Sequence, residues 1–250
     1  MRIVLFADNY IGLKVIEYLR SNNENIVGIF VHPPNCQNYY SEIKEASGLA
    51  PEQIQSVGKE WSDELVRKLK SMNPDIILVV FWNYILQKKV FEIPNQGCVN
   101  FHMSFLPYNR GKKPNVWPII DGTPAGISIH YIDEGIDSGA VISQQKIEVE
   151  LTDTAKTLYE KMIDAFPNLF EETWPKLKTG SIEIKKSLEA GTFHLDKEFK
   201  ELDQIDLEKK MYPLELINLL RARTYPPHPS AYFLKDEKKV YVRVWLEYGE

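Results

Sequence analysis

Cysteine is scarce in this sequence, and its scarcity excludes two kinds of small stabilised domain. The 250 residues include only two cysteines, Cys36 and Cys98. Two thiols cannot build a disulfide framework, and they cannot supply a four-cysteine zinc site. The five histidines are scattered, and no pair has the spacing of metal ligands on one helix face. The sequence therefore predicts no bound metal.

Long apolar runs and an excess of positive charge are also missing. No stretch approaches the length of a membrane-spanning helix, and the apolar run at the start is too short for a signal peptide. The formal net charge of −5 offers no general attraction for nucleic acid. We therefore expect a cytoplasmic protein with neither a membrane nor a nucleic acid as partner.

The glycine-rich turn of a dinucleotide-binding fold is absent as well. The first residues read as a buried strand from Ile3 to Ala7, a helix from Gly12 to Leu19 and a second strand from Ile26 to Val31. This order predicts a βαβ unit and a parallel sheet. Only Gly12 follows the first strand, so the backbone cannot approach a pyrophosphate there, and a nicotinamide or flavin cofactor is disfavoured.

The rest of the chain predicts one large α/β domain over residues 1–180 and a small C-terminal α+β region over residues 181–250. The expected elements of the large domain are a loop with one helical turn from Pro33 to Gly58, a helix from Ser62 to Met72, strands from Asp75 to Phe81 and Cys98 to His102, a short helix from Pro114 to Ile120, strands from Ala125 to Ile132 and Ala140 to Val149, and a helix from Asp153 to Gly180 that Pro167 kinks or interrupts. The C-terminal region is expected to hold a helix from Pro213 to Ala222 and a hairpin formed by Ala231–Leu234 and Val240–Leu246.

The clearest chemical pattern lies between Gly97 and Gly139. Asn100 and His102 alternate with apolar residues in a predicted strand, so their side chains project from the same face. A histidine can act as a general base, an asparagine can donate a hydrogen bond to a developing oxyanion, and Asp137, in a turn flanked by glycines, can stabilise the imidazolium. No G-x-S-x-G sequence surrounds Ser104. We therefore predict direct attack of an amine on a carbonyl, without a covalent enzyme intermediate.

Two further segments have a functional and a structural interpretation. Trp82 and Tyr84 follow a predicted strand at its carboxyl end, where ligands bind in open α/β sheets, but they can equally pack on the next helix. Arg110, Lys112 and Lys113 form a basic loop after the Asn/His strand. Such a loop is often only a solvated surface, whereas its position here favours a phosphate ligand.

Two motifs resemble the signatures of the folate-dependent formyltransferases. Residues Asn100 to Pro107 resemble their N-x-H-x-S-x-L-P signature, and Asp133 to Gly139 is similar to their D-x-G-x-D-T/S-G signature. The resemblance covers residues 1–180 and implies a Rossmann-like mixed sheet, 10-formyltetrahydrofolate as the donor, and Asn100, His102 and Asp137 as the catalytic residues. The residues that it places near the pterin are Phe81, Trp82, Tyr84, Ile85, Leu86, Ile132 and Asp133.

Two more segments resemble the branch of this family that formylates nucleotide-linked amino sugars. The loop Arg110 to Asn115 is similar to the loop after the signature in that branch, and Arg221 to Pro227 resembles its R-A-x-T-Y/F-P-P segment. The implied acceptor is a dTDP-linked amino-dideoxy sugar, for example dTDP-4-amino-4,6-dideoxyglucose, of the kind made for surface polysaccharide such as lipopolysaccharide O-antigen. Tyr225 is the implied partner of the thymine, and the implied partners of the pyrophosphate and sugar are Arg110, Lys112, Lys113 and Asn115. The apolar hairpin further suggests a homodimer.

Other members of the family fit less well. Methionyl-tRNA formyltransferases usually carry a basic C-terminal domain, glycinamide ribonucleotide formyltransferases are usually shorter, and the deformylase relatives carry a regulatory domain ahead of the catalytic one. An alternative from a different class is a non-catalytic module that binds a nucleotide sugar or a folate. The residues leave open which amino sugar is used, whether its amine is at C3 or C4, and which base the nucleotide has.

Overall fold

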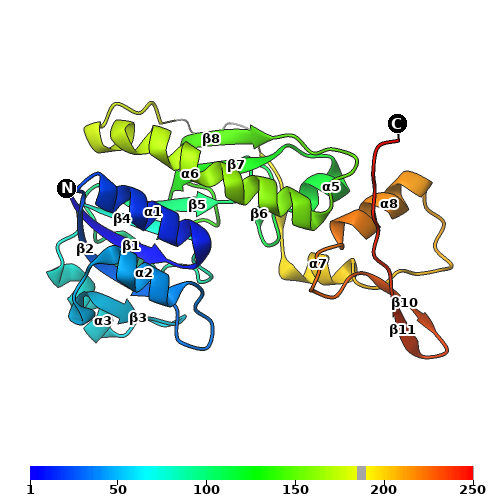
Figure 1. The fold of residues 1–250 in the computed structure, drawn as a ribbon, viewed down its shortest axis with the longest axis horizontal. Coiled ribbons are helices and arrows are strands. Elements are labelled where there is room, and N and C mark those ends of the chain that lie inside the picture. The colour runs from blue at the N-terminus through cyan, green and yellow to red at the C-terminus, as the bar shows by residue number, and fades with distance from the viewer. Residues whose placement is uncertain (185–189, 250) are drawn as a thin grey trace. The chain divides into compact units, whose positions relative to one another are not determined.

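The structure, a computed structural model, describes residues 1–184 and 190–249, and its centre is a seven-stranded sheet (Figure 1). The strand order is β3-β2-β1-β4-β5-β7-β8. The strands are β1 (Arg2–Ala7), β2 (Asn25–Val31), β3 (Ile54–Ser56), β4 (Ile76–Val80), β5 (Cys98–His102), β7 (Ala125–Tyr131) and β8 (Val141–Ile147). The first five pair in parallel, whereas β7 runs antiparallel to β5. The expected Rossmann-like mixed sheet is therefore confirmed.

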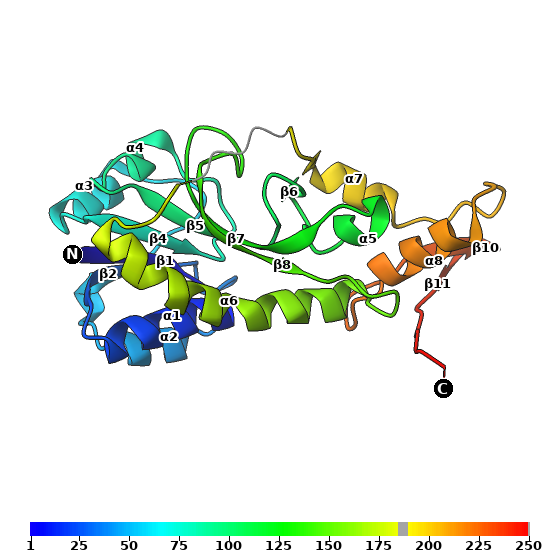
Figure 2. The same ribbon diagram turned by 90° about the horizontal axis from the view of Figure 1, so that it is seen from above.

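Helices cover both faces of the parallel part of the sheet. The helices are α1 (Asn9–Ser21), α2 (Tyr40–Ser47), the short 3-10 helix η1 (Pro51–Gln53), α3 (Asp63–Ser71), α4 (Lys88–Phe91), α5 (Trp117–Asp121), α6 (Ala155–Thr179), α7 (Asp196–Glu201) and α8 (Pro213–Ala222). Figure 2 shows α1 and α2 on one face of this sheet and α3 and α4 on the other. Covering both faces explains why the strands read as continuous apolar runs in the sequence.

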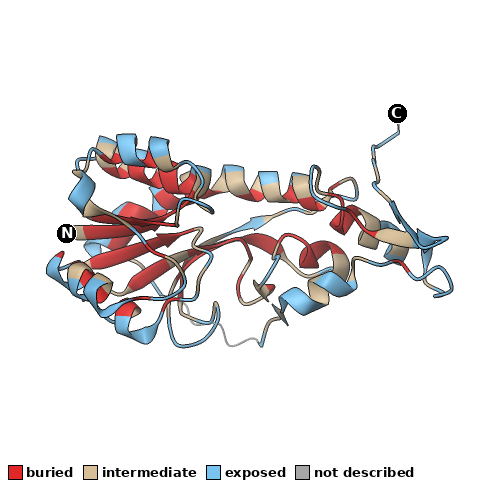
Figure 3. Ribbon diagram, turned by 90° about the horizontal axis from the view of Figure 1, so that it is seen from below, coloured by how far each residue is buried: buried red, intermediate tan, exposed pale blue. Residues whose placement is uncertain are grey.

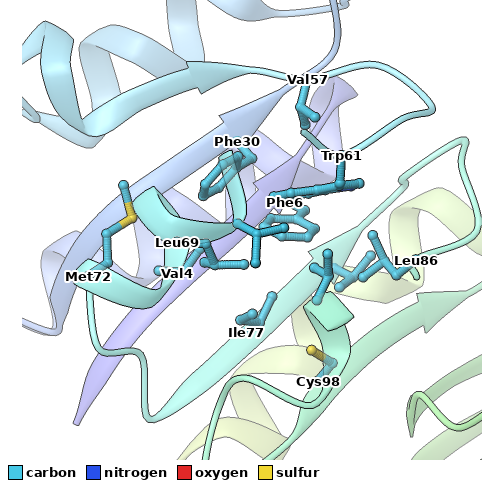
Figure 4. Close-up of a cluster of buried hydrophobic side chains, with 13 residues drawn as sticks. Val4, Phe6, Phe30, Val57, Trp61, Leu69, Met72, Ile77, Leu86 and Cys98 are labelled. Carbon is cyan, nitrogen blue, oxygen red and sulfur yellow. The ribbon is translucent and has the colours of Figure 1, made fainter. Parts of the chain in front are cut away.

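Aromatic rings fill the space between the sheet and α3. The ring of Phe6 lies 5.0 Å from that of Phe30 and 5.2 Å from that of Trp61, measured between centroids (Figure 4). On the opposite face, the ring of Phe170 of α6 lies 5.4 Å from the rings of both Tyr18 and Phe101. Strands β1, β2, β4, β5 and β7 are accordingly buried along most of their length, and the outer faces of the helices are exposed (Figure 3). These two layers hold the carboxyl ends of β4 and β5 in place.

The long helix α6 differs from its prediction. It runs unbroken through Pro167 and Pro175, so an interruption at Pro167 is wrong, whereas the alternative, a kink at Pro167, stays a prediction. A proline inside a helix costs about 3 kcal/mol or more. Phe166 and Phe170 are almost completely buried on either side of Pro167, and each buried aromatic ring contributes about 1.5–3 kcal/mol, which offsets that cost. The helix ends at Thr179, directly before Gly180, the predicted stop, whose φ of +69° suits a glycine.

Other predicted boundaries were confirmed or shifted by local interactions. The Ser62 hydroxyl accepts a hydrogen bond from the Leu65 N–H at 3.2 Å, so the predicted N-cap of α3 is confirmed. The expected loop from Pro33 to Gly58 contains α2 and β3 instead, because short elements with weak periodicity leave little signal in the sequence. The short helix expected from Pro114 begins only at Trp117.

The chain forms two compact units. Unit 1 comprises Met1–His102, Ser128–Ser143 and Phe166–Lys186, and unit 2 comprises Met103–Ile127, Gln144–Ala165 and Ser187–Glu250. The predicted domain boundary at residue 180 follows the order of the chain rather than this spatial division, and it stays a prediction. In the ranges 1–184 and 190–249, no helix is both long enough and apolar enough to cross a membrane.

Unit 2 contains two small sheets. In one, β6 (Arg110–Gly111) pairs in parallel with β9 (Phe193–His194), a pairing that the sequence did not predict. In the other, β10 (Tyr232–Lys235) pairs antiparallel with β11 (Lys238–Tyr241). The expected hairpin is therefore present, but its second strand ends at Tyr241 and not at Leu246.

Candidate functional site

The polar cluster of unit 1 is built on the pairing of β5 with β7. Asn100 pairs with His130 and His102 pairs with Ser128 across the two strands. Side chains alternate along a strand, so Asn100 and His102 lie on one face, and the antiparallel register places His130 beside Asn100. His130 is a site residue that the sequence did not reveal. The available signal was the alternation of Ser128 and His130 with buried isoleucines in a strand that returns beside β5.

A chain of hydrogen bonds fixes the Asn100 amide. The His130 ring lies 2.8 Å from the Tyr131 carbonyl oxygen through Nδ1, which therefore donates, and Nε2 is left to accept. The Asn100 Nδ2 lies 3.1 Å from this Nε2 and donates to it. Burial, with the nearby His102, lowers the pKa of His130 from 6.5 to about 4, which keeps the acceptor neutral. One N–H of the Asn100 side-chain amide is thus bonded to His130. This bond fixes the plane of the amide, and with it the direction of the second N–H.

Asp137 brings a carboxylate to both histidines. Its Oδ2 lies 3.6 Å from the Nε2 of His102, and its Oδ1 lies 3.8 Å from the Nε2 of His130. Asp137 has a left-handed backbone with a φ of +50°. The turn before it is shaped by Asp133, whose Oδ1 accepts hydrogen bonds from the Gly135 N–H at 3.0 Å and the Ser138 hydroxyl at 2.6 Å. The glycine-flanked turn therefore returns Asp137 to the strand that carries His102.

The arrangement suits proton transfer beside a polarised carbonyl. The Nε2 of His102 is buried and makes no hydrogen bond within the part of the chain that the structure describes. At 3.6 Å the Asp137 carboxylate is too distant for a hydrogen bond to this nitrogen but close enough to stabilise a positive charge on the ring. His102 can therefore take a proton, Asp137 can favour the resulting imidazolium, and Asn100 can donate to an oxygen that gains negative charge.

The aromatic segment after β4 packs against a buried histidine. The ring of Trp82 stacks on His32, with centroids 4.0 Å apart and an interplanar angle of 22°. The N–H of Asn83 donates to the Nε2 of His32 at 3.3 Å. The Tyr84 hydroxyl lies 3.8 Å from the Sγ of Cys36. Trp82 and Tyr84 thus have packing partners of their own, while the indole Nε1 is buried and makes no hydrogen bond in the described residues.

The other residues that the resemblance places near the pterin divide into buried and exposed ones. Leu86 is buried in the cluster of Figure 4, and Ile132 packs against the same cluster. The ring of Phe81 lies 5.4 Å from that of Phe166. Ile85 is 75% exposed and Ile136 is 41% exposed. The structure therefore offers two exposed apolar side chains, Ile85 in the segment from Phe81 to Leu86 and Ile136 in the turn that follows Ile132 and Asp133.

The basic loop of unit 2 carries three positive charges, and the pKa of the exposed Asp196 is lowered chiefly by its hydrogen bond to Lys200 and further by Lys113 and Lys112. In the described ranges, Arg110, Lys112 and Lys113 form no ion pair within 4.0 Å of an acidic group. Arg110 lies over the ring of Phe193 at 5.9 Å, and the Nζ of Lys113 lies 5.3 Å from the ring centre of Phe199. Cations that lie against aromatic rings and form no close ion pair in the described residues are suited to an anionic ligand.

Asn115 and Tyr225 are both held by unit 2. Asn115 is buried, and its Nδ2 donates to the Ala155 carbonyl oxygen at 2.9 Å at the start of α6. The ring of Tyr225 packs against Tyr159 at 5.5 Å and against His228 at 5.3 Å. Burial raises the pKa of Tyr225 to about 12, so its hydroxyl stays protonated. Asn115 thus has a structural contact, and Tyr225 presents a fixed, neutral ring.

The arginines of the segment from Arg221 to Pro227 have structural partners. The guanidinium of buried Arg221 donates to the carbonyl oxygens of Glu150 at 2.8 Å and Asp153 at 3.0 Å. Arg223 forms an ion pair with Asp203 and lies 4.1 Å from the ring centre of Phe199. These contacts fix the backbone that presents Tyr225. Across the described residues, no group of three or more histidine, cysteine, aspartate or glutamate side chains is placed to hold a metal ion.

The depressed pKa of His130 predicts a loss of stability in mild acid. The unfolded chain binds a proton at His130 as the pH falls through 6.5, whereas the folded chain does so only at about 4, so stability present above pH 6.5 is lost toward pH 4. Between pH 7 and pH 5 the free energy of unfolding should fall by about 2 kcal/mol through this residue. Urea unfolding of the wild type and of His130→Gln checks this, because the variant should lose about that much less. Burial also lowers the pKa of His32, but this residue is present in both proteins, so its contribution cancels in the difference between them. Equal losses in the two proteins would contradict the prediction.

Comparison with known families and relatives connects this geometry to an enzyme class. Residues 1–173 match the formyl transferase family, and residues 198–248 match an N-formyltransferase dimerization C-terminal domain. The methionyl-tRNA formyltransferase of Thermodesulfovibrio yellowstonii is 32% identical over 245 residues, which cover 94% of this chain and 77% of that protein. The dTDP-4-amino-4,6-dideoxyglucose formyltransferase of Mycobacterium tuberculosis is 36% identical over 151 residues, which cover 60% of this chain and 64% of that protein.

Solved structures share the fold over most of the chain. A 4-N formyltransferase from Francisella tularensis has a TM-score of 0.84 and 25% identity, and the match covers 99% of this chain and 98% of that one. A formyltransferase from Anoxybacillus kamchatkensis was solved with UDP-4,6-dideoxy-4-formamido-L-AltNAc and tetrahydrofolate. It has a TM-score of 0.60 and 25% identity, and the match covers 80% of this chain and 89% of that one. The similarity thus extends into the C-terminal region that follows α6.

Proposed function

Because the chain belongs to the formyl transferase family, we propose that it transfers a formyl group from 10-formyltetrahydrofolate to the amino group of a dTDP-linked amino-dideoxy sugar, for example dTDP-4-amino-4,6-dideoxyglucose. The observation that carries this proposal is the cluster of Asn100, His102 and Asp137. The Asp137 carboxylate lies 3.6 Å from His102, and the Asn100 amide is fixed by His130 at 3.1 Å. This cluster provides a base, a charge partner and an oxyanion donor, which are the groups that an acyl transfer requires.

The folate donor is supported by side chains of the segment after β4 and of the turn before Asp137. Exposed Ile85 and Ile136 offer apolar contacts for a flat ring, and the buried Nε1 of Trp82 lacks an acceptor in the described residues. The enzyme from Anoxybacillus kamchatkensis was solved with tetrahydrofolate bound. When bound, 10-formyltetrahydrofolate supplies the formyl carbonyl. The residues that would hold its pterin are those of the segment from Phe81 to Leu86, together with Ile132 and Asp133.

The side chains of the cluster then have distinct tasks. His102 takes the proton that the sugar amine loses when it attacks, through the Nε2 that makes no hydrogen bond in the described residues. Asp137 stabilises the imidazolium from 3.6 Å and helps to pass the proton to the leaving nitrogen. The second N–H of the Asn100 amide donates to the carbonyl oxygen as that oxygen becomes negative. His130 stays neutral and only orients Asn100.

The acceptor is supported by the charges and rings of unit 2. Arg110, Lys112 and Lys113 are cations without ion-pair partners in the described residues, as a pyrophosphate requires. The Oδ1 of Asn115 adds an acceptor for the sugar, since the bond to Ala155 uses its Nδ2. Tyr225 offers its ring to the thymine. The Mycobacterium relative, named for a dTDP-linked amino sugar, favours the same nucleotide.

The C-terminal region supports a homodimer. Residues 198–248 match a dimerization domain, and the exposed side chains of this region include Tyr212 at 76%, Trp245 at 85% and Tyr248 at 66%. Large apolar side chains that are exposed together in one region commonly mark an interface. We place the subunit contact on this region and the hairpin of β10 and β11.

A second acceptor, methionyl-tRNA, is favoured by one observation. The Thermodesulfovibrio relative carries that activity in its name, and its match covers 94% of this chain. The net charge of −5 argues against it, because tRNA binding depends on basic surfaces that contact phosphates. We therefore rank the nucleotide sugar first.

A panel of acceptors tests the proposal directly. The purified protein is incubated with 10-formyltetrahydrofolate and, separately, with dTDP-4-amino, dTDP-3-amino and UDP-4-amino sugars and with methionyl-tRNA. Mass spectrometry should find one added formyl group on a dTDP-linked sugar. Formylation of methionyl-tRNA alone would replace the sugar by the second acceptor. Tight binding of a nucleotide sugar with no product on any acceptor would favour a non-catalytic module.

A further inference from the structure

A stacked pair of rings belongs to two residues that contact the backbone of the basic loop in unit 2. The ring of His194, on β9, stacks on that of Trp117, at the start of α5, with centroids 3.9 Å apart and an interplanar angle of 8°. The His194 side chain is only 12% exposed. A stack this parallel between two distant segments fixes the position of each segment relative to the other.

Both partners of the stack hold the backbone of Lys112. The Trp117 Nε1–H donates to the Lys112 carbonyl oxygen at 2.7 Å. The Lys112 N–H donates to the His194 carbonyl oxygen at 3.0 Å. The donor and the acceptor of one loop residue are therefore bonded to the two residues whose rings stack. A movement of either ring would shift the peptide that carries Lys112 and its cationic neighbours.

A glycine makes this close approach possible. A Cβ atom on Gly111 would lie 2.4 Å from the His194 carbonyl oxygen, and the φ of Gly111 is +91°. No other residue type fits that space and that backbone conformation. The backbone of the loop is therefore packed directly against β9, and a displacement of β9 would displace the loop.

The His194 ring lies beside two carboxylates, although neither of its ring nitrogens makes a hydrogen bond in the described residues. Its Nε2 lies 3.1 Å from the Oδ2 of Asp121, and its Nδ1 lies 3.8 Å from Glu198. Asp121 forms no ion pair with the loop cations in the described residues. The positive charge of the loop is therefore not paired with Asp121.

We infer that His194 is a positioning residue for the nucleotide part of the acceptor: through its stack on Trp117 and its bond to Lys112, it fixes the loop of Arg110, Lys112 and Lys113 for a nucleoside diphosphate. This inference rests on the proposed function, in which that loop meets the pyrophosphate. His194 itself touches no reacting atom. Its loss should therefore weaken the acceptor and leave the folate and the chemical step unchanged.

Three variants separate this role from general stability. His194→Ala removes the stack, His194→Phe retains a ring but frees Asp121, and Trp117→Phe retains a ring but removes the donor to Lys112. His194→Ala should raise the KM for the nucleotide sugar by about tenfold or more, with kcat and the KM for 10-formyltetrahydrofolate within about twofold of wild type. The two phenylalanine variants should fall between wild type and His194→Ala. Lys197→Ala, exposed on the same segment, is the matched control and should behave as wild type.

Calorimetry with dTDP gives a readout that does not need formyl transfer. His194→Ala and Trp117→Phe should weaken dTDP binding in parallel with their rise in KM. If the wild type binds dTDP but formylates no acceptor, the proposed function fails, and weaker dTDP binding by the variants still supports the positioning role. Folded variants with unchanged dTDP binding and unchanged acceptor KM would overturn the inference, as would a wild type that binds no dTDP. If His194→Ala does not fold, Trp117→Phe decides by the same criteria.

Discussion

His102→Ala should lower kcat for formyl transfer by about 100- to 10,000-fold, because general-base catalysis contributes a factor of that size. The Nε2 of His102 is buried, lies 3.6 Å from Asp137 and makes no hydrogen bond in the described residues, so no neighbouring protein group is hydrogen-bonded to it in advance. His130 cannot replace it, because its Nε2 accepts from Asn100 and burial lowers its pKa to about 4. Steady-state kinetics with saturating donor and acceptor measure the effect.

Two controls keep this prediction specific. His102→Gln retains a polar side chain of similar length, and its kcat should fall as far as that of His102→Ala because an amide takes up no proton at neutral pH. Tetrahydrofolate and dTDP should bind both variants about as tightly as wild type, since His102 contributes to the reaction and not to ground-state binding. Turnover near the wild-type rate in a folded His102→Ala protein would remove His102 from the role of base.

Local patterns predicted the central strand of the site well. β5 spans Cys98 to His102 as expected, since a buried strand with period-two alternation is determined by its own residues. The same alternation placed Asn100 and His102 on one face. The turn that carries Asp137 was marked by its two glycines. A Cβ atom at Gly139 would lie 1.8 Å from the backbone oxygen of Tyr131, so this glycine reflects a steric requirement.

Interactions between segments that are distant in the chain could not be predicted from the sequence. His130 becomes part of the site only through the register of β7 against β5, and register depends on how two strands meet. The pairing of β6 with β9 joins residues far apart in the chain, and each strand has only two residues, so neither carries a periodic signal. Pro167 does not interrupt α6 although proline is unfavourable inside a helix, because the burial of its neighbours outweighs that local cost. The reaction was thus predictable from motifs, whereas the support of the site was not.

The hydrogen bond to His130 determines what the loss of the Asn100 side chain should do to the reaction rate. Asn100→Ala should lower kcat by about 100- to 1,000-fold, the usual cost of losing one oxyanion donor. The Asn100 amide donates to His130 at 3.1 Å, so the orientation of its second N–H is fixed before substrate binds, and no reorganisation is needed during the reaction. Single-turnover measurements with both substrates bound isolate this step from product release.

The variant Asn100→Asp distinguishes the effect of losing the hydrogen-bond donor from the effect of changing the size of the side chain. The carboxylate keeps the volume of the amide but donates no hydrogen bond and places a negative charge beside the oxygen that becomes negative. It would also lie next to the Nε2 of His130 and favour the imidazolium, which raises the pKa of His130 and adds a proton near Asp137. The Asp variant should therefore be at least as slow as the Ala variant. If Asn100→Asp retained more than about a tenth of wild-type turnover, hydrogen-bond donation by Asn100 could not supply the factor expected of an oxyanion donor.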